Sequence, residues 1–330
     1  MKTTKSTDVL VLTLAWCLLA ASATSAQSPN QPAKEITLDL GGNASLKLAL
    51  IPAGKFLMGS PDSEEAHRKD EVLHEVAISK PFYMGVSHVT VDQFAAFVKE
   101  SGYKTDAEKE GWSESIETKN GKLLTGKFKK GKFAVKRMSG ASWRDPGFDQ
   151  KGDHPVVQVS WNDAKAFCDW LSMKSGMTVA LPTEAQWEYA CRAGTKTAWP
   201  WGDTPADGKG WANCADQSLK RMLPDDAGIT CFNWDDGFVF TSPVGSFKAN
   251  ALGLFDMIGN AAHWCQDRYG DYEIGAATDP TGADAGVLRV VRGGSWNNYA
   301  PRNCRSAARY KFAPNFRNER YGFRVVMDLK

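Results

Sequence analysis

The feature that most constrains the fold is a stretch of about 90 residues after Gly194 that shows no sustained helix or strand pattern. It is rich in Gly, Asp, Asn and Trp. A loop of this length inside a domain is uncommon, and it is usually functional or held in place by metal ions or disulfides. The whole chain contains 12 Trp and 30 Gly. We therefore expect a loop-rich fold whose irregular segments are fixed by large aromatic side chains.

The composition is that of a globular protein. The chain has 330 residues, of which 42% are hydrophobic and 24% are charged, and this balance excludes a disordered chain. The length allows one large domain or two small ones. The 40 basic and 38 acidic residues give a net charge of +2. Since no strong field of one sign results, we expect neither nucleic acid nor anionic lipid as a partner.

The amino terminus has the order of a secretory signal peptide. Two lysines precede an apolar run from Val9 to Ala21, and small residues follow it. The run is shorter than the roughly 20 residues that a membrane span needs, although an uncleaved anchor is the alternative. We therefore predict a signal peptide over residues 1–26. The mature protein would be exported, periplasmic or extracellular, with no membrane span after cleavage.

Short patterns of regular structure surround the irregular stretch. Apolar and polar residues alternate over residues 36–40 and 46–50, which predicts two strands. Capping patterns at Thr90, Ser160 and Thr183 each predict a helix that begins at the next residue. Further strands are predicted at residues 289–291, 306–309 and 322–326.

A basic insertion at residues 122–137 separates the first two predicted helices. Its Lys and Gly content is compatible with a polyanion site. Aromatic residues are limited to Phe128 and Phe133, however, so a solvated hairpin is the preferred interpretation.

The cysteines point to disulfides. Removal of the signal peptide, which contains Cys17, leaves six: Cys168, Cys191, Cys214, Cys231, Cys265 and Cys304. An even number in an exported chain fits disulfides, and the absence of a C-x-x-C pair disfavours a local zinc site. The spacing alone does not decide the pairing.

Seven segments of the mature chain together carry a family resemblance. They are Ile51–Ser60, His154–Trp161, Leu181–Tyr189, Pro200–Gly202, Gly253–Asn260, Arg292–Trp296 and Gly322–Arg324. In this order they resemble the formylglycine-generating enzyme family, also called the sulfatase-modifying factor family. The resemblance implies an α+β, loop-rich variant of the C-type lectin-like fold. On this basis residues 27–45 form a leader and first strand, and residues 46–330 form the family's domain.

The resemblance implies a copper site that this sequence does not reproduce. Family members oxidise a cysteine of a newly made sulfatase to formylglycine with oxygen and copper, which two cysteines bind after the Gly-Gly-Ser motif. The first position falls on Asn298 and the second lies near Cys304. An amide cannot replace a thiolate as a ligand of monovalent copper. We therefore expect neither copper at these positions nor authentic copper oxidase activity, with Cys304 as the only candidate catalytic residue.

The resemblance also implies a disulfide. In the family one bridge joins the positions of Cys191 and Ser306, and in a strand Cys304 would share a face with Ser306. A Cys191–Cys304 bridge is therefore preferred, and Cys214–Cys231 is a second candidate. A free, reactive Cys304 is the alternative.

Two calcium sites are implied in the same way. The first donor set is Asn213, Cys214, Asp236 and Phe238. All four would offer oxygen, as Ca²⁺ requires, and the alternative is a turn at Asn213 beside a solvated Asp236. The second donor set is Asp256, Gly259, Ala261 and His263. Imidazole is a poor calcium ligand, so we expect this second site to be weakened or empty and His263 to be a buried structural residue rather than a catalytic base.

Two classes of function follow. In the first, a modifying factor binds an extended protein segment, such as part of a sulfatase, and assists its oxidative maturation. Its groove would be formed by Ser295, Trp296, Asn298, Tyr299 and Arg309. In the second, the protein is a non-catalytic binding module, because its last segment also resembles the ligand-binding end of lectin-fold proteins diversified by retroelements. That surface would contain Tyr299, Arg302, Tyr310, Phe312, Phe316, Arg317 and Tyr321.

The surroundings of Cys304 discriminate between the two classes. A shallow, exposed aromatic patch would favour binding, whereas a cleft that ends near Cys304 would favour chemistry. A second thiol within about 4 Å of Cys304, unbridged, would restore soft-metal chemistry. We expect a monomer in either case.

Overall fold

The largest sheet brings the two ends of the folded chain together. Its strands are β1 (Glu35–Gly41), β2 (Ala44–Ile51), β5 (Phe82–Gly85), β16 (Val326–Asp328) and β10 (Val179–Ala180). In this order each strand pairs antiparallel with the next. Because β16 pairs with both β5 and β10, the last strand lies inside the sheet rather than at its edge. The strands predicted at residues 36–40 and 46–50 are confirmed.

The computed structural model describes residues 32–116, 118–119, 122–123, 136–223, 230–298 and 301–329, together with Met1. Residues 33–330 form one compact unit. The predicted signal peptide, most of the basic insertion and Tyr299 lie outside the described residues. Within the described part of the chain, no helix has the length and apolar character needed to cross a bilayer.

Smaller sheets complete the β structure. One contains β14 (Arg309–Phe312), β13 (Arg289–Arg292), β11 (Ala262–Arg268) and β15 (Tyr321–Gly322), in that order, and its pairs are antiparallel except for β11 with β15. Another contains β12 (Ala277–Thr278), β4 (His74–Ile78) and β3 (Gly54–Met58). Two ribbons pair β6 (Trp112–Ser115) with β9 (Lys136–Ser139) and β7 (Thr118–Lys119) with β8 (Lys122–Leu123).

The longer helices all begin with a capping box. They are α1 (Val91–Ser101), α2 (Asp106–Glu110), α3 (Trp161–Ser175) and α4 (Glu184–Arg192). Three helical elements are only one turn long. They are the 3-10 helices η1 (Pro205–Gly208) and η2 (Pro301–Cys304) and the α-helix α5 (Gln217–Lys220). In each capping box the Ser or Thr side chain and the third helical side chain satisfy two free N–H groups reciprocally. The caps at Thr90, Ser160 and Thr183 confirm the predictions, whereas the cap at Thr105 was not predicted.

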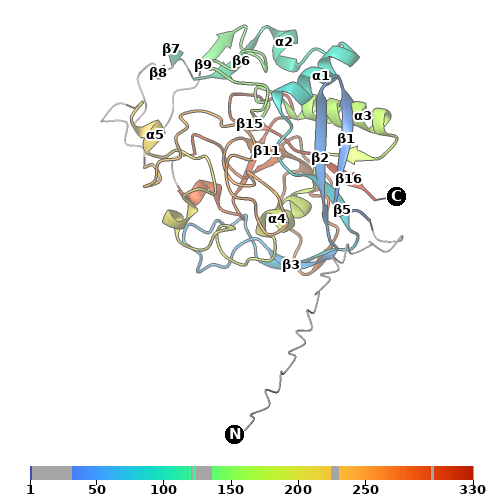
Figure 1. The fold of residues 1–330 in the computed structure, drawn as a ribbon, viewed down its shortest axis with the longest axis vertical. Coiled ribbons are helices and arrows are strands. Elements are labelled where there is room, and N and C mark those ends of the chain that lie inside the picture. Colours follow the sequence, from blue (N-terminus) through green and yellow to red (C-terminus); the bar gives the residue numbers. More distant parts are fainter. Residues whose placement is uncertain are drawn as a thin grey trace. The chain divides into compact units, whose positions relative to one another are not determined.

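Two aromatic clusters form most of the core. The first packs α1 and α3, which lie beside the β1–β2 hairpin (Figure 1), against the largest sheet. Its rings include Phe94, Phe97, Phe167, Trp264 and Phe323. The second surrounds α4 and buries Trp187, Phe232 and Trp234 together with Cys214 and Cys304. The two cysteine positions are therefore part of the core and are both closed to solvent.

The long irregular stretch is fixed by aromatic side chains, as predicted. Between α4 and β13 the described residues form only short elements, of which β11 is the longest. Trp199 stacks on Trp201 with ring centroids 5.9 Å apart, and Trp201 meets the edge of Trp234 at 6.4 Å. Gly208 has no room for a side chain, because a Cβ there would lie 2.7 Å from both of those last two rings.

Two of the predicted carboxy-terminal strands differ from the structure. β14 begins at Arg309, so residues 306–308 are irregular, and residues 323–325 lie outside any strand. The reason at residues 306–307 is that their carbonyls accept hydrogen bonds from the Arg292 guanidinium, at 2.7 Å and 3.0 Å, in place of a strand partner. The strand predicted at residues 289–291 is confirmed as β13.

A buried ion network links α4 to β13 and β14. Arg292, which is fully buried, donates to Glu188 and, at 3.1 Å, to Glu184. Arg309 donates twice to Glu184, at 2.7 Å and 2.8 Å. Burial tends to raise the pKa of Glu184, but the charges of Arg309 and Arg292 outweigh it and lower the pKa. Arg192 completes the network on Glu188 at 2.8 Å.

Removal of the Arg292 charge is expected to destabilise the fold strongly. Arg292→Met keeps most of the volume but removes the donor to Oε2 of Glu188 and to the carbonyls of residues 306–307, while Arg192 still binds Oε1 of Glu188. Loss of one partner of a buried ion pair costs about 3–5 kcal/mol. Urea unfolding should show a loss of this size, whereas Lys165→Met, which breaks an exposed pair with Asp169, should cost less than about 0.5 kcal/mol. A loss below about 1 kcal/mol for Arg292→Met would contradict this account.

Candidate functional site

Two glycines shape the corner at the end of β13. Gly293 and Gly294 have φ values of +88° and +71°, which favour glycine. A Cβ on Gly293 would lie 2.7 Å from the Met257 carbonyl oxygen and 3.1 Å from Nδ1 of His263. A Cβ on Gly294 would lie 2.8 Å from Cβ of Cys304. The corner therefore brings the backbone directly against the cysteine that the sequence singles out.

A cleft of about 200 Å³ opens beside this corner. Its lining residues are Ala262, Gly294, Ser295, Asn297, Asn298, Asn303, Tyr310, Phe312, Arg320 and Tyr321. Gly294 lines the cleft and packs against Cys304, so one residue separates the cleft from that cysteine at this point. The structure thus brings Ser295 and Asn298 together, as predicted, and adds Asn297 and Arg320.

Two predicted groove residues lie elsewhere. Trp296 is fully buried behind the cleft, where its indole N–H donates to the Glu319 carbonyl at 3.1 Å. Its ring packs against Phe240 with centroids 5.2 Å apart. Arg309 belongs to the ion network on Glu184 and not to the cleft. Trp296 and Arg309 lie outside the cleft for the same reason. A buried indole N–H or guanidinium takes the position in which it can reach a hydrogen-bond acceptor.

Asn298 uses its amide to close a turn. Its Oδ1 accepts from the Ser295 backbone N–H at 3.1 Å and from the Ser295 hydroxyl at 3.0 Å. Its Nδ2 donates to the Asn303 carbonyl at 3.3 Å. The amide atoms are thus engaged in local structure, and neither is a soft donor. The residues at the family's first copper position do not fit that metal.

Cys304 has a different thiol as its neighbour from the one predicted. Its Sγ lies 4.0 Å from Sγ of Cys214 and 3.3 Å from the Pro301 carbonyl. Cys191 instead lies beside Ser306, with Sγ 3.9 Å from Oγ. All six cysteines in the described residues are free.

The predicted Cys191–Cys304 and Cys214–Cys231 bridges are therefore wrong for this structure. The strand argument fails because Cys304 ends the turn η2 instead of lying in a strand, so it shares no face with Ser306. Cys304 thus has a second, unbridged thiol at about the 4 Å separation expected for a soft-metal site. The pKa of the Cys214 thiol is raised well above its usual value by the adjacent Cys304 and by burial.

The first predicted calcium set leaves two oxygen atoms without partners. Oδ1 of Asn213 and Oδ2 of Asp236 are buried and accept no hydrogen bond. The other polar atom of each side chain has a partner. Nδ2 of Asn213 donates to the Phe240 carbonyl at 2.8 Å, and Oδ1 of Asp236 accepts from the Phe238 N–H at 2.8 Å. Burial, with a contribution from the charge of Asp216, raises the pKa of Asp236 to about 7. Buried polar atoms are rarely left unpaired, so this donor set fits a hard cation.

The second predicted set does not fit calcium. The Ala261 carbonyl already contacts Nε2 of His88 at 2.6 Å, and Nε2 of His263 accepts from the Arg324 guanidinium at 3.1 Å. A fixed positive charge therefore lies among the expected donors. Burial, His88 and Arg324 lower the pKa of His263 well below its usual value, while burial raises the pKa of Asp256 to about 6.

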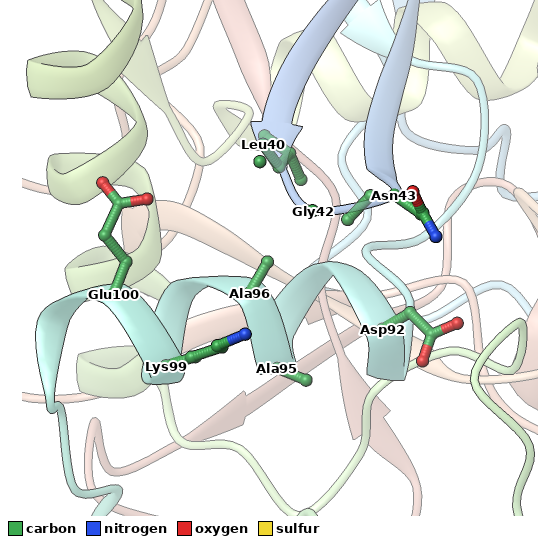
Figure 2. Close-up of a pocket in the computed structure, with 10 residues that line it drawn as sticks. Leu40, Gly42, Asn43, Asp92, Ala95, Ala96, Lys99 and Glu100 are labelled. Carbon is green, nitrogen blue, oxygen red and sulfur yellow. The ribbon is translucent and has the colours of Figure 1, made fainter.

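Larger cavities lie away from the Cys304 cleft. An open groove of about 560 Å³ runs between the β1–β2 turn and α1, where Ala96 points toward Gly42 and Asn43 and charged side chains lie along the helix (Figure 2). A second cavity of about 570 Å³ contains Asp267. Size alone therefore does not identify the functional site.

With this geometry in place, comparisons with known proteins decide the family. A model described as the sulfatase-modifying factor enzyme 1-like domain matches residues 43–329. The chain belongs to this family. Formylglycine-generating enzyme from Bos taurus is 34% identical over 304 residues, with 87% of this chain and 77% of the relative covered. The predicted α+β, loop-rich fold of the formylglycine-generating type is confirmed.

The chain is also similar to a relative named as inactive and to a solved structure. Inactive C-alpha-formylglycine-generating enzyme 2 from Bos taurus is 32% identical over 309 residues, with 88% of this chain and 90% of the relative covered. The solved structure of PvdO from Pseudomonas aeruginosa superposes with a TM-score of 0.66 at 27% identity and covers 91% of this chain and 100% of that one. Because relatives named as enzymes and as inactive are equally similar, identity does not decide activity.

Asp267 should make the stability of the protein depend on pH. Burial, followed by the charge of Glu184, raises the pKa of Asp267 to about 8. The folded chain therefore keeps a proton that the unfolded chain releases near pH 4. It follows that the free energy of unfolding falls as pH rises from about 4 to 8 and levels off above that range.

Asp267→Asn tests this dependence, because the amide mimics the protonated carboxyl group. Urea unfolding between pH 5 and 9 should show a smaller decline for the variant than for the wild-type protein. Asp169→Asn, at an exposed residue paired with Lys165, is the matched control and should leave the decline unchanged. Equal slopes for Asp267→Asn and the wild-type protein would contradict a protonated Asp267.

Proposed function

We propose that this protein is an exported modifying factor that binds an extended, cysteine-containing segment of a protein client in the cleft beside Ser295 and assists its oxidative maturation. The observation that carries the proposal is that Gly294, which lines the cleft, packs against Cys304. Membership of the sulfatase-modifying factor family supports a protein client. The apolar amino-terminal segment supports export to the periplasm or the extracellular space.

The walls of the cleft supply groups suited to a peptide backbone. Nδ2 of Asn297 is buried at the cleft and has no hydrogen-bond acceptor. Buried donors are nearly always paired, so this amide can donate to a carbonyl of the bound segment. Oδ1 of the same side chain accepts from the Ser295 hydroxyl at 3.1 Å. The hydroxyl has one proton, which Oδ1 of Asn297 shares with Oδ1 of Asn298, and this contact orients the Asn297 amide in the absence of a client.

The alternative, a binding module without chemistry, has less support. Its aromatic residues pack on one another, since Phe312 lies 4.7 Å from Phe316 and 4.9 Å from Tyr321 between ring centroids. Tyr321 and Arg317 are buried. A recognition surface of rigid aromatic contacts requires exposed rings, and these residues instead support the wall of the cleft.

Calcium would have a structural part in this function. Asn213 and Asp236 would bind the ion, and the Cys214 and Phe238 carbonyls would complete the donor set. The ion would supply positive charge to two buried oxygens that otherwise lack partners. It would also fix the loop that carries Cys214, next to the cleft.

The peptide proposal is tested by binding. A fluorescent peptide with the sequence Cys-x-Pro-x-Arg should bind the purified protein, and Asn297→Ala should weaken binding about tenfold or more by removing one buried hydrogen bond. The measurement is fluorescence anisotropy, with the thermal midpoint as the check on folding. Asn43→Ala removes the same amide from the separate groove of Figure 2 and should leave binding unchanged. Absence of binding at millimolar peptide would defeat the proposal.

The calcium proposal is tested by stability. Saturating calcium should raise the thermal midpoint of the wild-type protein, because a ligand present at a hundred times its Kd stabilises by about 2.7 kcal/mol. Asp236→Asn should abolish that rise. Asp256→Asn, in the second donor set, should retain it. An unchanged midpoint in calcium for the wild-type protein, compared with a chelator, would contradict a structural ion.

A further inference from the structure

The cavity of about 570 Å³ that contains Asp267 lies on the other face of β14 from the Cys304 cleft. Arg309 lines this cavity, whereas Tyr310 and Phe312 line the cleft. Successive side chains of a strand point to opposite faces, so the strand itself separates the two spaces. A ligand in the cavity would therefore bind at a site of its own.

Most of the cavity lining comes from the segment 270–284, which is anchored at several points. At its start, the Gly270 carbonyl accepts from the Arg309 guanidinium at 3.1 Å. In its middle, β12 pairs with β4. Near its end, the Ala283 N–H donates to the Arg268 carbonyl at 3.2 Å. The cavity is therefore formed without a ligand, and a preformed site loses less conformational freedom on binding.

The lining is acidic, although the chain as a whole has a net charge of +2. Six carboxyl groups and one guanidinium line the cavity. The carboxyl groups belong to Glu184, Asp267, Asp271, Glu273, Asp279 and Asp284. The guanidinium, that of Arg309, is matched by Glu184, to which it donates at 2.7 Å and 2.8 Å. The other carboxyl groups favour a positively charged ligand, because a recess lined by one sign of charge concentrates ions of the opposite sign.

Asp267 gives the cavity a buried acceptor. The residue is only 3% exposed, and its Oδ2 accepts from the Glu184 N–H at 2.9 Å. In the described part of the chain, no other residue donates a hydrogen bond to Oδ1. That oxygen lies toward Gly282, a second lining residue, where a Cβ would be 3.1 Å away from it. Since buried polar atoms are rarely left without a partner, Oδ1 is a position for an N–H group of a ligand.

The spacing of the carboxyl groups decides the kind of cation. Among the described residues, no group of three or more His, Cys, Asp or Glu side chains is placed to bind one metal ion. Carboxyl groups that are spread along a cavity fit a ligand with several positive centres. Ammonium groups donate hydrogen bonds and carboxylates only accept them. Apolar lining is also present for the chain between such centres, from Met58, Ala185, Ala277 and Ala283.

We propose that this cavity binds a linear aliphatic polyamine, whose ammonium groups contact Asp267 and the carboxylates of the segment 270–284 and whose methylene chain lies on the apolar lining. The volume is within the range of about 300–1,000 Å³ that is usual for small-molecule sites. The proposal goes beyond the proposed function, because neither the client segment nor calcium uses these residues. A basic peptide is the other cationic ligand that the experiment must distinguish.

The first experiment is calorimetric titration of the full-length protein with spermidine. The wild-type protein should bind one equivalent, with an affinity that falls as salt is added. The double variant Asp271→Asn, Asp284→Asn should bind about tenfold more weakly or worse, because it loses two charged acceptors. The matched control, Asp169→Asn with Asp207→Asn, removes two exposed carboxylates outside the cavity and should leave the affinity unchanged. Thermal midpoints check that each variant is folded.

A second pair of variants keeps all charges and changes only the space. Ala276→Trp places a large ring on a lining residue and should abolish spermidine binding. Ala285→Trp adds the same ring at an exposed residue outside the lining and should retain it.

Three results would overturn the proposal. The first is equal affinity of the Ala276→Trp and Ala285→Trp variants for spermidine. The second is equal weakening by the two double variants, which would indicate a general effect of charge. The third is binding of an oligolysine peptide without binding of spermidine at millimolar concentration. None of these results bears on the Cys304 cleft, so this proposal and the proposed function can fail separately.

Discussion

One buried guanidinium, that of Arg292, sets the position of the segments that build the site. It binds Glu184 and Glu188 on α4 and the carbonyls of residues 306–307, just after Cys304. Removing such charges from water is costly, and the cost is offset only where geometry is good and further hydrogen bonds are made. Because Arg292 is the last residue of β13, the turn at Gly294 begins from a fixed point. The distance between the cleft and Cys304 follows from that arrangement.

The loop at residues 213–214 gives hard and soft donors to different neighbours. Oδ1 of Asn213 is buried without a hydrogen-bond partner, whereas Sγ of Cys214 lies 4.0 Å from Sγ of Cys304. The proposed calcium ion would use the Asn213 oxygen and leave the Cys214 sulfur uncoordinated, because calcium takes oxygen ligands. An ion that fixes the oxygen side would also restrict the sulfur side, because the two share one peptide unit.

What could be predicted from the sequence was mostly local. The caps at Thr90 and Thr183 are written in four consecutive residues, and the structure has both. The position of Cys304 was not predictable in this way, because it depends on where Arg292 holds the following carbonyls. Trp296 was misplaced for a similar reason, since its N–H is directed by a carbonyl 23 residues further along the chain. Cys214 was predicted as a carbonyl donor and as a candidate disulfide partner of Cys231, whereas its sulfur lies beside Cys304, which comes from a segment 90 residues further along the chain.

Family membership fixes the scaffold and leaves the chemistry to a few atoms. Relatives named as active and as inactive match this chain at 34% and 32% identity, so overall similarity carries no information about catalysis. At the family's first copper position the Asn298 amide is bound within a turn, and no soft donor remains there. The residues that hold the backbone here, Arg292 with Glu184 and Glu188, lie on β13 and α4. The fold can therefore persist when the residue at the copper position changes, because the side chains that fix the scaffold are not those at that position.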